Sequence, residues 1–252
     1  METRDALFQL LLRLADDHLI LGHRVSEWCG HAPMLEEDLA LPNMALDVIG
    51  QARALYQYAA EVEGVGKTED DYAYLREERE FRNCILVERP NEDFAHTMLR
   101  QLYFAAFMRP YWEAMAESGD ETLRGIAGKA VKEVAYHIRH CGEWVIRMGD
   151  GTDESAARMK AAVETLHPYA LELFETDEVT DALAEAGVAP DPAAMRAPWD
   201  AVINEVFTEA LLTIPEKAIP ASGGRSGFHQ EALGHLLSSM QYLQRANPGA
   251  TW

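Results

Sequence analysis

The residues EVAYHIRHCGEWVIRM, positions 133–148, close a segment that begins at Glu121 and ends before Gly149-Asp150-Gly151. Glu133, His137 and His140 are offset by four and three positions, so they share one face of a helix. A carboxylate and two imidazoles on one face raise the question of a di-metal centre inside a helical bundle. Apolar residues of the same segment recur every three or four positions, the pattern of an amphipathic α-helix: Val131, Val134, Ile138, Cys141, Val145 and Met148.

The remainder of the chain has the same helical period, with no internal repeat, low-complexity tract or linker. Two long pairs of helices predict a four-helix bundle with additional C-terminal helices, an all-α fold in a single domain over residues 1–252. Cys84–Val87 is interpreted as a buried connector, and Pro215–Gly227 as a mobile loop. The predicted helices are Asp5–Cys29, Glu36–Val62, Glu69–Arg82, Phe94–Glu117, Glu121–Met148, Asp153–Phe174 with Asp153 as N-cap, Asp177–Ala186, Met195–Leu212 and His229–Arg245.

The charge and the cysteines limit the possible functions. A formal net charge of -20 argues against nucleic acid or an anionic membrane as partner, because both are themselves negatively charged. Cys29, Cys84 and Cys141 are far apart and odd in number, which disfavours a disulfide framework or a zinc knuckle. Without an apolar N-terminal run or a long apolar span, we expect a cytoplasmic protein.

A di-iron bundle takes a carboxylate from each of two helices and a Glu-x-x-His pair from each of the other two. Asp17 and Asp47 suit the carboxylate positions, but three residues after Asp47 comes Gly50 rather than His. Glu133 is followed at the same offset by Tyr136. The matching region of Phe94–Glu117 offers Gln101 and Phe104, with no acid. The sequence therefore predicts that these metal positions are degenerate.

The direction of the polar face gives a second argument. At about 100° per residue, Glu133 lies roughly 120° from the centre of its helix's apolar stripe, and Asp47 is similarly displaced from its own. This favours surface or subunit-interface residues over metal ligands. Asp16-Asp17-His18 is likewise interpreted as a solvated or interface network, and the aromatic residues of Phe94–Glu117 as core. The sequence has no P-loop, dinucleotide-binding or nucleophile-elbow motif.

Five motifs in order along the chain resemble the PaaC family, the structural subunit of the bacterial ring-1,2-phenylacetyl-CoA epoxidase. The resemblance covers essentially the whole chain. It implies a ferritin-like fold without metal ligands of its own, and therefore no catalytic residues. The motifs are SEWCGHAP (Ser26–Pro33), LALPNMALDVIGQAR (Leu39–Arg53), KEVAYHIRH (Lys132–His140), RMGDGTDES (Arg147–Ser155) and MQYLQR (Met240–Arg245).

The resemblance implies a non-catalytic scaffold in phenylacetate degradation, with no cofactor of its own. Its partners would be a catalytic di-iron subunit of the same fold, a small accessory subunit and a reductase. Two alternatives stay open. One is a divergent di-iron oxygenase or oxidase that uses Asp17, Asp47, Glu133 and His137. The other is a homodimeric acyl-CoA-binding helical protein.

Two surfaces are predicted to serve the complex. Glu133, His137, His140 and Trp144 fall within a narrow arc, and a Trp between polar groups is typical of interface patches. Lys217 and Arg225 flank the glycines of the loop Pro215–Gly227, and cations are needed to meet an anionic CoA. We expect these two cations near the CoA channel of the partner.

Overall fold

The computed structural model describes residues 1–215 and 217–250, and this part of the chain contains helices and no strand. Glu216, within the predicted loop Pro215–Gly227, lies outside the described residues. The α-helices are α1 (Thr3–Ser26), α2 (Leu35–Glu63), α3 (Glu69–Tyr74), α4 (Ile85–Glu88), α5 (Phe94–Met115), α6 (Glu121–Gly149), α7 (Asp153–Ala170), α8 (Glu178–Glu185), α9 (Arg196–Glu209) and α10 (Glu231–Ala246).

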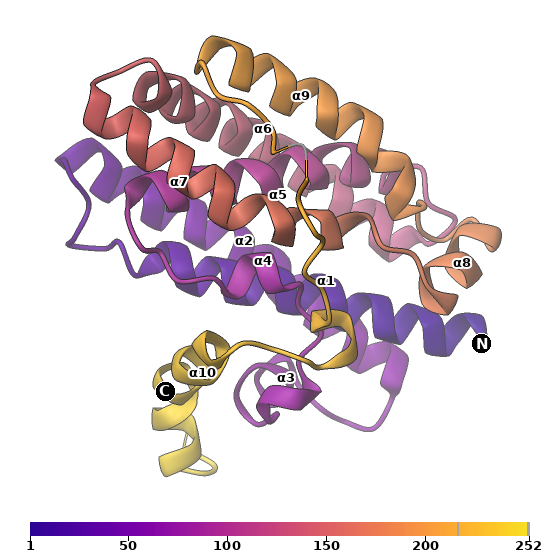
Figure 1. The fold of residues 1–252 in the computed structure, drawn as a ribbon. Helices are drawn as coiled ribbons and strands as arrows, with labels where there is room; N and C mark the ends of the chain where they lie inside the picture. The colour runs from indigo at the N-terminus through magenta and orange to yellow at the C-terminus, as the bar shows by residue number, and fades with distance from the viewer. Residues whose placement is uncertain (216, 251–252) are drawn as a thin grey trace.

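The four longest elements that the period predicts, α1, α2, α5 and α6, form the central bundle (Figure 1). α1 pairs with α2, and α5 pairs with α6. The two pairs meet through rings, because His18 of α1 contacts Phe104 and Trp112 of α5 at centroid distances of 5.2 and 5.7 Å. α5 is buried along most of its length, so its aromatic residues are core, as predicted. The all-α, ferritin-like bundle with additional C-terminal helices is thereby confirmed.

Side chains that satisfy free backbone N–H groups begin several helices. Asp93 accepts from the amide of His96 at the start of α5, and Asp120 accepts from the amide of Leu123 at the start of α6. At α7 the cap is Thr152, which accepts from the amide of Ser155, and not Asp153 as predicted. Asp153 is instead the first helical residue, where its charge suits the helix dipole.

Four of the additional helices form two groups, while α8 packs against α1 (Figure 1). α7 and α9 lie along the α5–α6 side, whereas α3 and α10 lie together below the bundle. The predicted helix Glu69–Arg82 is wrong in extent, because α3 ends at Tyr74 and only a single 3₁₀ turn, Glu78–Glu80, follows. The Cys84–Val87 segment is a buried connector as predicted, and its last three residues belong to the short helix α4, which ends at Glu88. In the part of the chain that is described, no helix is long and apolar enough to cross a membrane.

Candidate metal centre

The centre of the bundle holds one polar side chain from each of its four helices. They are His18 of α1, Gln51 of α2, Gln101 of α5 and His137 of α6, and each is at most 3% exposed. Buried polar groups in an apolar bundle need hydrogen-bond partners. The contacts of these four side chains therefore decide whether the centre is suited to metal.

His137 is bonded on both sides of its ring. Its Nε2 lies 3.1 Å from Oδ2 of Asp47, and its Nδ1 lies 3.3 Å from Nε2 of Gln101. Because a carboxylate only accepts, Nε2 of His137 donates to Asp47, and Nδ1 accepts from the amide of Gln101. Neither ring nitrogen is left for a metal ion.

Glu133 is bonded to α2 in the same way. Its Oε2 accepts from Nε2 of Gln51 at 2.8 Å, and its Oε1 lies 3.3 Å from Nζ of Lys129. Asp47 and Glu133 thus face the groove between α2 and α6. The helical period correctly placed Asp47 and Glu133 away from the apolar stripes of their helices. The conclusion that this polar side of α6 is surface is wrong for His137, which is 1% exposed. The neighbouring helix, and not solvent, covers that side.

His18 is the fourth member of the centre. Its Nδ1 donates to the carbonyl of Leu14 at 2.7 Å. Burial lowers the pKa of His18, because an imidazolium is disfavoured away from water. Its Nε2 and the Oε1 atoms of Gln51 and Gln101 have no hydrogen-bond partner in the described part of the chain.

These residues do not fit a di-iron centre. Two iron ions need bridging carboxylates to balance their charge, whereas this centre offers two neutral amides and one free imidazole nitrogen. Gly50 and Tyr136 stand where Glu-x-x-His pairs need histidine, and Phe104 packs edge-on against His18. Among the described residues no group of three or more His, Cys, Asp or Glu side chains is placed to hold a metal ion.

The other two predicted interface residues, His140 and Trp144, also contact side chains of this chain. Nε2 of His140 lies 2.8 Å from Oε2 of Glu37, and the two side chains are 14% and 7% exposed. Trp144 forms a T-shaped contact with Phe94 at 5.0 Å between centroids, and the guanidinium of Arg147 lies over the Trp144 ring at 4.5 Å. The role of Glu133, His137, His140 and Trp144 at a partner interface stays a prediction.

The acids of α1 form a network buried within the chain, and the prediction of a solvated or interface network at Asp16-Asp17-His18 is wrong. All three side chains are at most 1% exposed. Asp16 accepts from the hydroxyl of Tyr56, from the guanidinium of Arg76 and from the amide of Arg82. The sequence misled because the connector between α3 and α5 folds back over α1, which no periodicity within α1 indicates.

Asp17 connects α1 to two segments remote in sequence. Its Oδ1 accepts from the amide of Cys84 at 2.7 Å, and its Oδ2 accepts from the guanidinium of Arg225 at 2.8 Å. Burial disfavours the charged guanidinium, but the neighbouring Asp17 carboxylate outweighs it and raises the pKa of Arg225. Arg225 is therefore an internal ion-pair partner, which the prediction of a mobile loop did not foresee.

Glu172, which sequence reasoning missed, holds the same loop in place. Its Oε1 accepts from the amides of Gly223 and Gly224 at 2.9 and 2.8 Å, and its Oε2 accepts from the amide of Ile85. A Cβ on Gly224 would lie 2.0 Å from the carbonyl oxygen of Asn83, so only glycine fits there. Lys217 is exposed. The CoA-proximal role of Lys217 and Arg225 stays a prediction.

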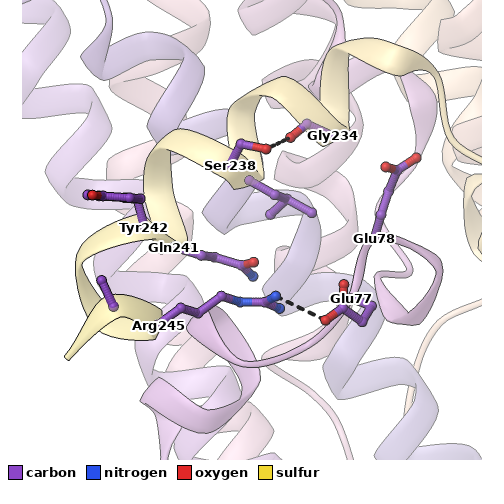
Figure 2. A pocket seen from close by; sticks show the side chains of 9 residues that line it. Glu77, Glu78, Gly234, Ser238, Gln241, Tyr242 and Arg245 are labelled. Carbon is purple, nitrogen blue, oxygen red and sulfur yellow. Dashed lines mark hydrogen bonds and ion pairs between the residues drawn. The ribbon is translucent and has the colours of Figure 1, made fainter. Parts of the chain in front are cut away.

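A cavity of about 640 Å³ lies outside the bundle, between α10 and the Glu77–Glu78 segment (Figure 2). Arg245 reaches across it and donates to Glu77 at 3.0 Å and to the carbonyls of Tyr74 and Arg76. Ser238 donates to the carbonyl of Gly234 within α10. These polar groups of the cavity are therefore paired within the chain.

Comparison with known proteins gives concordant matches. All residues, 1–252, match the family model described as phenylacetic acid catabolic protein. A relative from Escherichia coli (strain K12), named as the C subunit of 1,2-phenylacetyl-CoA epoxidase, is 46% identical over 241 residues. The match covers 96% of this chain and 97% of that protein.

Proposed function

Since the chain belongs to the phenylacetic acid catabolic protein family, we propose that it is the structural subunit of a phenylacetyl-CoA epoxidase complex. Its relative in Escherichia coli is named as one subunit of that epoxidase, and the similarity extends over nearly the whole of both chains. In this proposal the chain pairs with a catalytic di-iron subunit in aerobic phenylacetate degradation. It contributes no reacting group of its own.

The observation that carries the non-catalytic part of this proposal is the chemistry of the bundle centre. The centre of this chain holds the neutral amides of Gln51 and Gln101, and His137 is bonded on both ring nitrogens. Two buried, uncompensated carboxylates would cost stability, and neutral amides avoid that cost. Such a centre supports a scaffold role and no oxygen chemistry.

The partners in this proposal are the catalytic di-iron subunit, a small accessory subunit and a reductase, and the complex works in the cytoplasm. The di-iron cofactor resides in the catalytic subunit. This chain binds that subunit and stabilises its active arrangement, because a related helical bundle offers large helical faces for packing.

Metal analysis of the chain purified alone tests the proposal. We expect no stoichiometric iron, because the centre lacks the acids and the imidazoles that two iron ions require. About two irons per chain, lost in the Asp47→Ala variant, would support the rival di-iron oxygenase built on Asp17, Asp47, Glu133 and His137. Tight binding of phenylacetyl-CoA by the isolated homodimer would support the rival acyl-CoA-binding protein.

A further inference from the structure

A second cavity, of about 180 Å³, lies between α1, α5 and the segments on both sides of α8. Exposed residues form its mouth, namely Glu175, Thr176 and Ser226. The cavity is therefore a pocket that is buried at one end and reaches solvent at the other. The apolar side chains of its inner wall are each at most 4% exposed: Leu10, Leu14, Phe107, Tyr111 and Leu173.

The size of this pocket and its two rings suit one aromatic ring of a ligand. An apolar cavity of about 150 Å³ is enough to hold benzene. Phe107 and Tyr111, which both line the pocket, are stacked with their centroids 5.5 Å apart and 24° between their planes. A ligand ring beside them gains an aromatic contact in addition to the burial of its own apolar surface.

The same pocket also presents hydrogen-bond donors. Arg13 lines it with a side chain that is 11% exposed, and Nε of Arg13 has no hydrogen-bond partner in the described part of the chain. Burial raises the pKa of the Tyr111 hydroxyl, and the guanidiniums of Arg225 and Arg13 oppose this shift, because both lie near that hydroxyl. A buried donor without a partner costs free energy, and a ligand oxygen would accept from it.

The charges around the pocket favour a neutral ligand. Arg13 donates to both carboxylate oxygens of Asp177, at 3.0 and 2.6 Å, and Arg225 pairs with Asp17 at 2.8 Å. Neither guanidinium is left to balance the charge of an anion. Two further acids line the pocket, Glu172 and Glu175. An anion would meet these carboxylates with repulsion, and a protonated amine would meet the two guanidiniums in the same way.

We propose that this pocket binds a small neutral molecule, made of one aromatic ring and one oxygen that accepts hydrogen bonds. The ring lies against Phe107 and Tyr111, and the oxygen accepts from the Tyr111 hydroxyl and from Nε of Arg13. Because Arg225 and Ser226 also line the pocket, a bound ligand holds the turn Gly224–Ser226 against α1 and stabilises the fold by mass action. The inference goes beyond the scaffold role and does not depend on it.

The test uses the full chain and benzamide, which has one ring, a carbonyl oxygen and no charge. We expect titration calorimetry to give a dissociation constant below about 1 mM. Benzoate and benzylamine have nearly the same size but carry a negative and a positive charge, so we expect both to bind at least about 10-fold more weakly. Benzamide should also raise the melting temperature of the chain, and the two charged probes should raise it less.

Two variants test where benzamide binds. Thr176→Trp places a large side chain at the mouth and should weaken binding by about 10-fold or more, because it obstructs entry. The matched control is Thr208→Trp, at an exposed threonine of α9 outside this pocket, which should bind as the wild type does. Tyr111→Phe keeps the ring and removes the hydroxyl. It should weaken benzamide by about 10-fold and leave the binding of toluene unchanged.

The melting temperature of each variant without ligand shows whether it has folded, and Thr176→Trp decides the location if Tyr111→Phe does not fold. Benzamide binding that Thr176→Trp does not weaken would place the ligand elsewhere and overturn the inference. Stronger binding of benzoate or benzylamine than of benzamide would overturn the neutral class of ligand. No binding of benzamide at about 10 mM would overturn the site itself. The scaffold role stands after each of these results, because it depends on partner binding.

Discussion

At the scale of single residues, Asp17 and Arg225 lie 208 positions apart in the chain and form an ion pair of 2.8 Å. The carboxylate is 1% exposed and the guanidinium 20% exposed. A buried pair is costly to assemble, but removing one member leaves the other charge without compensation. The pair therefore fixes the turn Gly224–Ser226 against α1, and the fold depends on both members together.

The Arg225→Ala variant should lower the free energy of unfolding by about 3–5 kcal/mol, because Asp17 is left buried and unpaired. Urea denaturation measures this. The matched control is Arg53→Ala, whose pair with Glu69 has the guanidinium 68% exposed. Exposed pairs contribute only about 0–1 kcal/mol. An Arg225→Ala variant as stable as Arg53→Ala would contradict the buried pair.

Gln51 places a neutral amide beside the carboxylate of Glu133, where a glutamate would place a second carboxylate. Gln51→Glu places that carboxylate against Glu133 in the groove between α2 and α6, and should destabilise the chain by about 1–3 kcal/mol at neutral pH. Repulsion and burial raise the folded-state pKa of the new carboxyl. The loss therefore grows as pH rises above about 4.3, the ordinary pKa of glutamate, and is small below it.

Urea denaturation at pH 7.5 and at pH 4 measures this effect of Gln51→Glu. Gln57→Glu is the matched control, because Gln57 also donates to a glutamate, Glu69, but on the surface. Equal effects of the two substitutions at pH 7.5 would argue that the centre is wetter than its burial indicates.

At the scale of elements, the sequence could not show what covers the polar side of α6. In the structure that side meets α2. Helical period located the long helices within a few residues and the apolar stripe of α6 correctly. Period does not say whether the polar side of a helix meets water or another helix. His137 is buried between helices, and Asp47 and Gln101 of two other helices satisfy its ring nitrogens. Only the tertiary arrangement supplies those partners.

The contacts of the connector Cys84–Val87 and of the loop Pro215–Gly227 could not be predicted for the same reason. Glu172 and Asp17 bond backbone amides of Ile85, Cys84 and Gly224, and such contacts leave no periodic trace in the sequence. Gly223-Gly224 correctly indicated a loop. Composition alone does not distinguish a mobile loop from a turn that is held by hydrogen bonds, as this one is. The prediction of degenerate metal positions depends only on residue identity at fixed spacing, and it stays a prediction.

A buried histidine just before α10, His229, helps to attach that helix. Nδ1 of His229 lies 2.8 Å from Oε2 of Glu88, both side chains are fully buried, and Nε2 lies 3.0 Å from the carbonyl of Phe81. Burial alone would lower the pKa of His229, but its bonds to Glu88 and to Phe81 outweigh burial and raise the pKa. This stabilisation is complete below the unfolded pKa of about 6.5 and is lost as pH rises through the folded value.

The stability difference between wild type and His229→Gln should therefore shrink as pH rises from 6 to 9. Chemical denaturation of both proteins at each pH measures it. His18, His23 and His167 have pKa values lowered mainly by burial and act in the opposite direction, but they cancel in the difference. A difference that stays constant over this range would mean that His229 does not bind its proton more tightly in the folded chain.

At the scale of the whole molecule, the outer surface of the bundle is better suited to a function than its centre. The bundle centre holds the neutral amides of Gln51 and Gln101, and His137 is bonded on both ring nitrogens, whereas α2 exposes a row of leucines to the outside. A helical bundle that retains its fold without metal ligands, and exposes an apolar face, is suited to hold a related subunit. We propose that this chain acts by binding the catalytic subunit.

The most direct test of this role compares two rates of phenylacetyl-CoA epoxidation by the catalytic di-iron subunit, accessory subunit and reductase. One rate is measured with this chain and the other without it. We predict little turnover without the chain, turnover restored as one equivalent is added, and none when the chain replaces the catalytic subunit. Full turnover in its absence would contradict the scaffold role.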